Sequence, residues 1–234
     1  IKNIEKDSGL YPTLTNHEEY DKAEKDAFAN YIKNEELYEK VKKFAEETSV
    51  KETDEATHQA MEALIHNLNT MHSRAGAQVP FSSLNFGTDT SAEGRMVVKN
   101  FLRATEEGLG NGETPIFPIS IFKVKEGVNY NPGDPNYDLF KQAIDCSAKR
   151  MFPNFSFIDA PFNLKYYKPG HPETEVAYMG CRTRVMGNVY DPSREITYGR
   201  GNLSFTSINL PRLAIEAKKE IKKFYEGLDE KLEL

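Results

Sequence analysis

The chain has 234 residues, of which 38% are hydrophobic, enough for one large domain or two small ones with a buried core. Its formal net charge is −6, and its 30 Lys and Arg are scattered among 36 Asp and Glu, which argues against a nucleic-acid partner but still allows a small anionic ligand such as a nucleotide. It contains no apolar run of about 18 residues and no leader-like start, so the sequence predicts a cytosolic chain without a membrane segment.

Residues 1–52 are expected to form a charged helical lead-in. Apolar side chains recur there at helical spacing, namely Tyr20, Phe28, Tyr31, Ile32, Leu37, Val41 and Phe44. A weaker pattern near Asn34 predicts two helices, and Thr48 and Ser49 predict an end before the next unit. Because the chain starts with Ile1 and its last helical pattern stops without a capping signal, both ends are expected to be cut ends.

Residues 53–234 are expected to form an α/β unit. Helical periodicity predicts helices at 52–71, 91–107 and 137–151, the second capped by Ser91 and ended by Gly108. Residues rich in β-formers predict strands at 78–86 and 116–124 between them. Because strands alternate with helices, we expect largely parallel pairing.

The last third of this unit is richer in turns. Short strands are expected at 155–158 and 174–178, with a last strand at 203–210. Pro211 then opens the final helical segment at a position that proline favours, and residues 218–234 continue an amphipathic pattern.

The two cysteines have different settings. Cys146 lies within an amphipathic helical pattern and is expected to pack in the core. Cys181 follows a predicted strand and Gly180, so it is expected on a turn, where it is either a small buried side chain or a nucleophile assisted by nearby arginines. A hydrolase dyad is disfavoured, because His171 is the only nearby histidine and has no orienting carboxylate at a recognisable spacing.

Several blocks in order resemble a known family. They are residues 66–81 (HNLNTMHSRAGAQVPF), 108–118 (GLGNGETPIFP), 149–155 (KRMFPNF), 179–182 (MGCR) and 199–202 (GRGN). Together they resemble the catalytic subunit of anaerobic, class III, glycyl-radical ribonucleoside-triphosphate reductases, from about Thr53 to Leu234. The resemblance implies part of a ten-stranded α/β barrel, in which a loop carries a cysteine into the barrel centre.

The resemblance also implies roles for single residues. Cys181 would be the thiyl-radical residue that abstracts the 3′ hydrogen of a ribonucleoside triphosphate. A glycyl radical, generated by an activating enzyme that uses S-adenosylmethionine and an iron–sulfur cluster, would first take the hydrogen atom of its thiol. Asn202 would be a neutral hydrogen-bonding partner of the sugar hydroxyls, and Asn209, expected on the last strand, is the second choice for that role.

A second, allosteric site for ATP and deoxynucleoside triphosphates is implied at a homodimer interface made by two helices, expected to be 52–71 and 91–107. Gln59, Glu62 and His66 share one stripe of the first helix and could contact an effector. A solvated or intersubunit face is the alternative for these three. The substrate phosphates are expected at backbone N–H groups of a helix start, for which Pro211 is one candidate.

Some family features are missing from these residues. The glycyl-radical loop, the four cysteines of the zinc site, the earlier strand cysteine and the ATP-sensing module are absent, and neither His58 nor His72 has metal-ligand spacing with a cysteine. The fragment is therefore expected to be inactive alone, with exposed strand edges that another chain or the lead-in covers. Other readings are a different glycyl-radical enzyme, a nucleotide-binding or dimerisation module without catalysis, and a structural protein.

Overall fold

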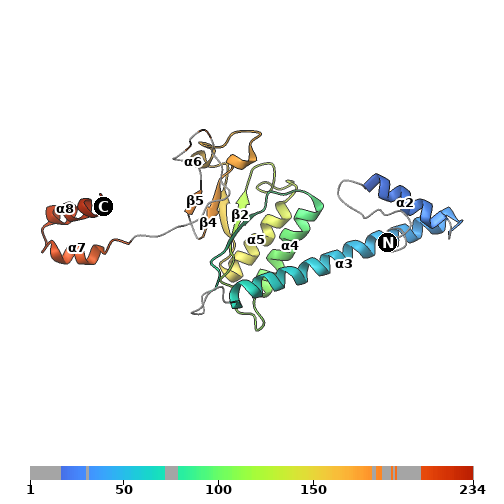
Figure 1. Cartoon of the computed structure of the whole chain (residues 1–234), viewed down its shortest axis with the longest axis horizontal. Coiled ribbons are helices and arrows are strands. Elements are labelled where there is room, and N and C mark those ends of the chain that lie inside the picture. Colours follow the sequence, from blue (N-terminus) through green and yellow to red (C-terminus); the bar gives the residue numbers. More distant parts are fainter. Residues whose placement is uncertain are drawn as a thin grey trace.

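The computed structural model describes residues 17–29, 32–71, 79–180, 183–185, 191, 193 and 207–233 (Figure 1). In chain order its elements are α2 (His17–Ala29), α3 (Glu35–Thr70), β1 (Ser83–Phe86), α4 (Ala92–Glu107), β2 (Ile119–Val124), α5 (Tyr137–Arg150), β3 (Asn154–Phe157), α6 (Pro161–Leu164), the 3₁₀ helix η1 (Pro172–Thr174), β4 (Ala177–Met179), β5 (Thr183–Val185), α7 (Leu210–Glu216) and α8 (Ile221–Leu232). None of these helices has the length and apolar character needed to cross a membrane.

Helix α3 is a single helix of 36 residues. Asn34 caps it, because the Asn34 Oδ1 accepts hydrogen bonds from the backbone N–H groups of Glu36 at 3.0 Å and Leu37 at 3.4 Å. The predicted break near Asn34 is confirmed, but the predicted end at Thr48 and Ser49 is wrong. No proline or glycine interrupts residues 35–70, and a few weak helix formers cost only some tenths of a kcal/mol each, which is too little to end a helix. The division into units 1–52 and 53–234 stays a prediction.

A three-stranded parallel sheet forms the centre of the described chain, in the order β1, β2, β3. Helix α4 connects β1 to β2 and helix α5 connects β2 to β3, as parallel pairing requires. The expected α/β alternation is therefore confirmed. Strands β4 and β5 pair separately as an antiparallel hairpin.

One face of the sheet packs against α4 and α5 (Figure 1). Phe122 on β2 is fully buried at the centre of this layer, and its ring lies 5.7 Å from that of Phe86 on β1 and 6.1 Å from that of Phe155 on β3. Val98 and Leu102 of α4 and three residues of α5 complete the cluster. A smaller cluster joins Ile65 of α3 to Phe101 and Ala104 of α4, so α3 packs along α4.

The predicted ends of α4 are confirmed. The Ser91 side chain accepts a hydrogen bond from the Gly94 N–H at 3.0 Å, and the helix stops at Gly108. Gly108 has φ +83°, and an added Cβ there would lie 2.6 Å from the Glu113 carbonyl oxygen. Glycine is therefore required at this position.

Strand limits differ from the predictions where proline or turns intervene. Strands β1 and β2 begin later than predicted, each after a proline without a backbone N–H to donate, Pro80 and Pro118. The predicted strand at 174–178 is displaced to 177–179, because Thr174 ends a 3₁₀ turn. The strand predicted at 203–210 is wrong for residues 207–210, since Leu210 already begins α7; residues 203–206 lie outside the described part.

The predicted C-terminal helical segment consists of two helices. Pro211 lies in the first turn of α7, as expected. Lys218 and Lys219, with φ values of +49° and +69°, then reverse the chain, and α8 packs against α7. The amphipathic pattern was right, but the turn inside it carries no glycine or proline and so was missed.

Candidate functional site

The β4–β5 hairpin flanks Cys181 on both sides. Met179 of β4 pairs with Thr183 of β5, and Gly180 before the cysteine is buried, with φ +57°. Cys181 itself lies outside the described residues, so its predicted place on a turn stays a prediction. The structure does confirm a strand directly before Gly180.

Side chains of β1 hold the strand that leads to this position. The Asn85 amide makes two hydrogen bonds to the backbone of Tyr178, because its Nδ2 donates to the Tyr178 carbonyl at 2.8 Å and its Oδ1 accepts from the Tyr178 N–H at 2.9 Å. The Gly180 N–H donates to the Ser83 Oγ at 3.2 Å. An added Cβ on Gly180 would lie 3.0 Å from the ring of Phe81. Three alternate residues of one segment therefore lie against the part of the chain that directly precedes Cys181.

An ion pair attaches the same part of the chain to β2 as well. The Lys123 Nζ on β2 lies 2.6 Å from a carboxylate oxygen of Glu175, and the two side chains are only 14% and 19% exposed. The Lys125 Nζ lies 3.8 Å from the other oxygen of Glu175 and is 32% exposed. The carboxylate is thus shared between a nearly buried lysine and a more exposed one.

Cys146 is a packing residue, as predicted. Its side chain is fully buried between α5 and α4, and its Sγ donates to the Leu102 carbonyl at 3.6 Å. Burial, with a smaller contribution from the nearby Glu106 carboxylate, raises the pKa of the thiol to about 11. At neutral pH this thiol is protonated and shielded, which excludes it as a nucleophile.

The structure describes only one of the two asparagines predicted to face the substrate. Asn202 lies outside the described residues. Asn209 was predicted on a strand, and this is wrong. It caps α7 instead: its Oδ1 accepts a hydrogen bond from the Arg212 N–H at 3.0 Å, and its side chain is exposed. The Asn–Leu–Pro order is typical of a capped helix start, so the correct assignment was available from the sequence.

Gln59, Glu62 and His66 lie on α3 and are all exposed. The Nδ1 of His66 lies 3.4 Å from the Thr70 hydroxyl one turn later on the same helix. The structure therefore places the predicted effector residues on an accessible stripe, without bringing them into a common pocket.

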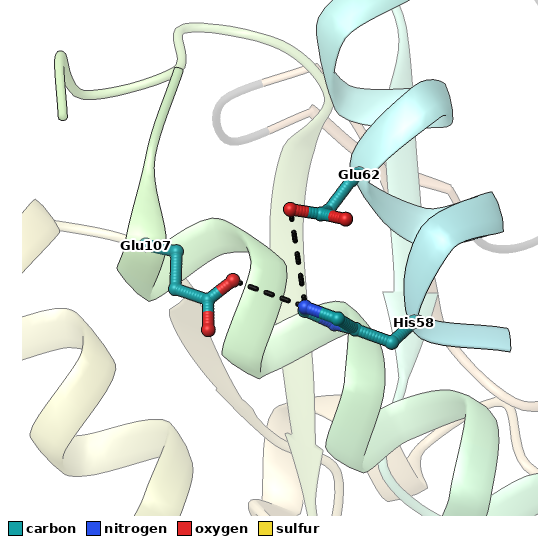
Figure 2. A group of neighbouring side chains, drawn as sticks. All are labelled: His58, Glu62 and Glu107. Atoms are coloured by element: carbon teal, nitrogen blue, oxygen red, sulfur yellow. Dashed lines mark ion pairs between the residues drawn. The ribbon is translucent and has the colours of Figure 1, made fainter. Parts of the chain in front are cut away.

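A cluster that the sequence analysis missed joins α3 to the end of α4. Figure 2 shows His58 and Glu62 of α3 pointing towards Glu107 of α4. The His58 Nε2 lies 3.1 Å from Glu107 and 3.9 Å from Glu62, and Arg103 bonds the other oxygen of Glu107 at 2.9 Å. The spacing of His58 and Glu62 at i and i+4 was readable, but Glu107 comes from another helix and was not.

The His58 cluster is an interhelical hydrogen-bonded contact and not a good metal centre. Its three ligand atoms lie within 4.8 Å of one another, close enough in principle to hold a cation. A metal on Nε2 would, however, require a proton on Nδ1, and metal-bound imidazoles normally donate that proton to an acceptor. The Nδ1 of His58 is buried and has no hydrogen-bond partner within the described part of the chain. Binding a metal would leave a buried N–H unsatisfied, whereas a hydrogen bond from the Nε2–H group to Glu107 needs no proton on Nδ1, and this favours the hydrogen-bonded contact.

Two grooves of about 680 Å³ each lie along α3. The first is mainly apolar and is lined by α3 alone, with Val41, Phe44 and Ala56 among its residues. The second lies between α3, α4 and α5, and its cations are already paired: Arg95 bonds Asp138 at 2.7 Å, and Lys99 lies 3.5 Å from Asp54. The second groove is therefore close to neutral despite its basic side chains.

Residues 22–234 match the protein family described as "Anaerobic ribonucleoside-triphosphate reductase" (NRDD). Proteins with that name are similar to this chain in Haemophilus influenzae (37% identical over 83% of the chain), Escherichia coli (35% over 84%) and Enterobacteria phage T4 (36% over 78%). The matched segment covers 27%, 28% and 30% of those proteins, so the chain spans under a third of the length of the relatives it matches.

Proposed function

Because the chain belongs to the anaerobic ribonucleoside-triphosphate reductase family, we propose that it is the part of such an enzyme that carries the thiol which starts ribonucleotide reduction. One observation carries the proposal: Cys181 comes two residues after the end of a strand, β4, and side chains of the parallel sheet hold that strand and Gly180 at defined points. A hydrogen-atom transfer needs donor and acceptor atoms held within contact distance in a site that excludes water. A strand mounted on a rigid sheet is suited to that task.

The chemistry assigned to Cys181 is a sequence of hydrogen-atom transfers. The glycyl radical, produced by a radical S-adenosylmethionine activating enzyme, would lie on another part of the complete subunit and supply the acceptor for the thiol hydrogen. Cys181 would then take the 3′ hydrogen of the bound ribonucleoside triphosphate, after which the 2′ hydroxyl leaves as water. The two electrons needed to complete reduction come from an external donor, formate or a dithiol protein. Such oxygen-sensitive chemistry fits a cytoplasmic location.

Two side-chain amides are proposed to contact the sugar. Asn202 would hydrogen-bond the hydroxyl groups as a neutral partner. Asn209 remains the second choice, and since the helix cap uses its Oδ1, any contact with substrate would fall to Nδ2. The phosphates would bind backbone N–H groups of a helix start. The start of α7 is poorly suited to this, because Pro211 has no N–H and the N–H groups of Leu210, Arg212 and Leu213 already donate to Ile208 and Asn209.

We also propose that β1, β2 and β3 are consecutive parallel strands of a ten-stranded α/β barrel. The β1–α4–β2–α5–β3 order supports it, because barrels of this kind are built from parallel strands with helices outside. The outer strands β1 and β3 would continue their pairing with strands from the rest of the subunit, which would also provide the zinc site.

A homodimer with an allosteric nucleotide site is proposed at an interface made by α3 and α4. The apolar groove along Val41, Phe44 and Ala56 supports a second copy of the chain as its occupant, because an isolated helix rarely exposes such a surface. Gln59, Glu62 and His66, further along α3, would contact ATP or a deoxynucleoside triphosphate. As a second candidate function, the isolated chain would act only as this dimerisation and effector-binding module.

Alanine at each cysteine of the complete subunit tests the main proposal. Cys181→Ala should abolish ribonucleotide reduction while effector binding, measured by calorimetry, stays the same. Cys146→Ala is the matched control and should retain turnover, because that thiol is buried and protonated. Reduction by the Cys181→Ala enzyme at the normal rate would contradict the proposal.

A further inference from the structure

The two faces of the central sheet differ in chemistry. Successive residues of a strand point to opposite faces, so Phe86 on β1 and Phe122 on β2 point towards α4 and α5, while Ser83, Asn85 and Lys123 point the other way. That second face mixes polar and apolar side chains, because Ile119 and Ile121 of β2 also lie on it and are buried. Polar side chains in a mostly buried strand need partners, and here all three find them in the segment that leads to Cys181.

The three contacts follow one another along that segment. Lys123 binds Glu175, Asn85 binds the backbone of Tyr178, and Ser83 binds the N–H of Gly180. The attachment points thus lie six, three and one residues before Cys181. The last two bind backbone groups, one within β4 and one at Gly180 directly after it, so they fix the position of the chain and not merely that of a side chain.

The Asn85 amide performs the task that a neighbouring strand performs in a sheet. It donates to the carbonyl and accepts from the N–H of the same residue, Tyr178, at 2.8 and 2.9 Å. This two-bond pattern fixes both the register and the tilt of β4 against β1. Ser83, two residues earlier on the same face, adds a bond next to the cysteine at Gly180.

We infer that Asn85 and Ser83 are positioning residues for the thiol of Cys181: they anchor β4 to the sheet and so set where the sulfur sits relative to the substrate. The inference rests on the proposed function of Cys181 for its catalytic meaning. The anchoring itself rests only on the contacts of β1 with β4. A shift of about 1 Å in a reacting group can lower a rate by about 100-fold, so anchoring of this kind bears directly on turnover.

Thiol labelling of the 234-residue chain tests the anchoring without requiring activity. The chain has two cysteines, and Cys146 is buried with its pKa raised to about 11, so a maleimide added to the native chain reports on Cys181. Asn85→Ala should change the labelling rate of Cys181 by about fivefold or more, because β4 loses two backbone attachments.

Asn69 provides the matched control for this measurement. It is also an asparagine with a multiply bonded amide, since its Oδ1 accepts from the N–H groups of Ile116 and Phe117 and its Nδ2 donates to carbonyls of Ile65 and Phe117. It clamps α3 to the segment before β2 and none of these bonds involves β4. Asn69→Ala should lower the melting temperature as Asn85→Ala does and leave the labelling rate of Cys181 within about twofold of the wild type.

The complete reductase gives the catalytic test. Asn85→Ala should lower kcat by about 10- to 100-fold, leave KM within about twofold, and leave the yield of glycyl radical in the electron paramagnetic resonance spectrum unchanged. Asn85→Asp, which keeps the oxygen that accepts from Tyr178, should recover part of kcat. Unchanged labelling in Asn85→Ala overturns the anchoring; changed labelling combined with an active Cys181→Ala enzyme overturns the proposed function of the cysteine instead.

Discussion

The ion pair of Lys123 and Glu175 should be asymmetric in its contribution to stability. Glu175→Gln leaves the Lys123 ammonium, 14% exposed, with no other carboxylate within ion-pair distance in the described part of the chain. Lys123→Met leaves Glu175 with Lys125, whose Nζ is already 3.8 Å away. The first change therefore creates a nearly buried unpaired charge, and the second does not.

The magnitudes follow from the burial of the two side chains. Breaking a fully buried pair by removing one partner costs about 3–5 kcal/mol, and the residual exposure of this pair reduces the figure for Glu175→Gln to about 2–3 kcal/mol. Lys123→Met should cost about 1 kcal/mol, since Lys125 takes over the carboxylate and the methionine still fills the space. The double variant should cost less than the sum of the two, with a coupling free energy of about 1–2 kcal/mol.

Urea unfolding of the four chains measures these free energies, followed by circular dichroism and by the fluorescence of the 12 tyrosines in a chain without tryptophan. Glu216→Gln is the control, because its partner Arg212 lies 2.7 Å away in a pair whose side chains are 55% and 74% exposed, and its unfolding midpoint should not move. Equal costs for the two single variants, or costs that simply add, would refute the reasoning.

Three further predictions concern the helices α3, α4 and α5 and the core of the sheet. The Asn100 amide, by hydrogen-bonding the Asp54 carboxylate, lowers the pKa of that carboxyl in the folded chain. The associated stability is present above the ordinary carboxyl pKa and is lost as pH falls from there through the lowered value, so over that acid range the free energy of unfolding should drop more in the wild type than in Asp54→Asn, as urea titrations at a series of acid pH values would show. Phe122→Ala should cost about 3–5 kcal/mol in the same urea assay, because the ring is fully buried against the rings of Phe86, Phe140 and Phe155, and a cost below about 1 kcal/mol would contradict its central place in the core. Cys146 should react with a maleimide only after unfolding, and reaction in the native chain at neutral pH would contradict its shielding.

Local signals in the sequence predicted most of the elements around the sheet. Ser91 and Gly108 marked α4 because caps act over three or four residues, and the alternation of strands with helices was sufficient for parallel pairing. The helix end predicted at Thr48 was wrong because weak helix propensity alone does not end a helix, and no proline or glycine interrupts α3. The turn at Lys218 and Lys219 was not predicted, because both lysines adopt positive φ angles, a conformation that a glycine usually marks in a sequence.

The contacts that build the site could not be predicted from local signals in the sequence. Asn85 and Tyr178 are 93 positions apart, and His58 and Glu107 belong to different helices. Neither pairing follows from spacing, because both depend on how the elements cross in space. Asn209 differs, since its capping role is local and was misjudged by assigning a strand in its place.

The strand sequences nevertheless hold a signal that a purely hydrophobic reading overlooks. A parallel strand covered on both faces should be apolar at every position, yet β1 carries Ser83 and Asn85 and β2 carries Lys123, all at alternate positions on one face. Burying such groups is unfavourable unless each finds a partner, so their regular spacing implies a polar structure beyond the sheet. That structure is the segment from Glu175 to Gly180. The face of the sheet that mixes these polar groups with the buried Ile119 and Ile121 is therefore the face on which the candidate catalytic strand is held.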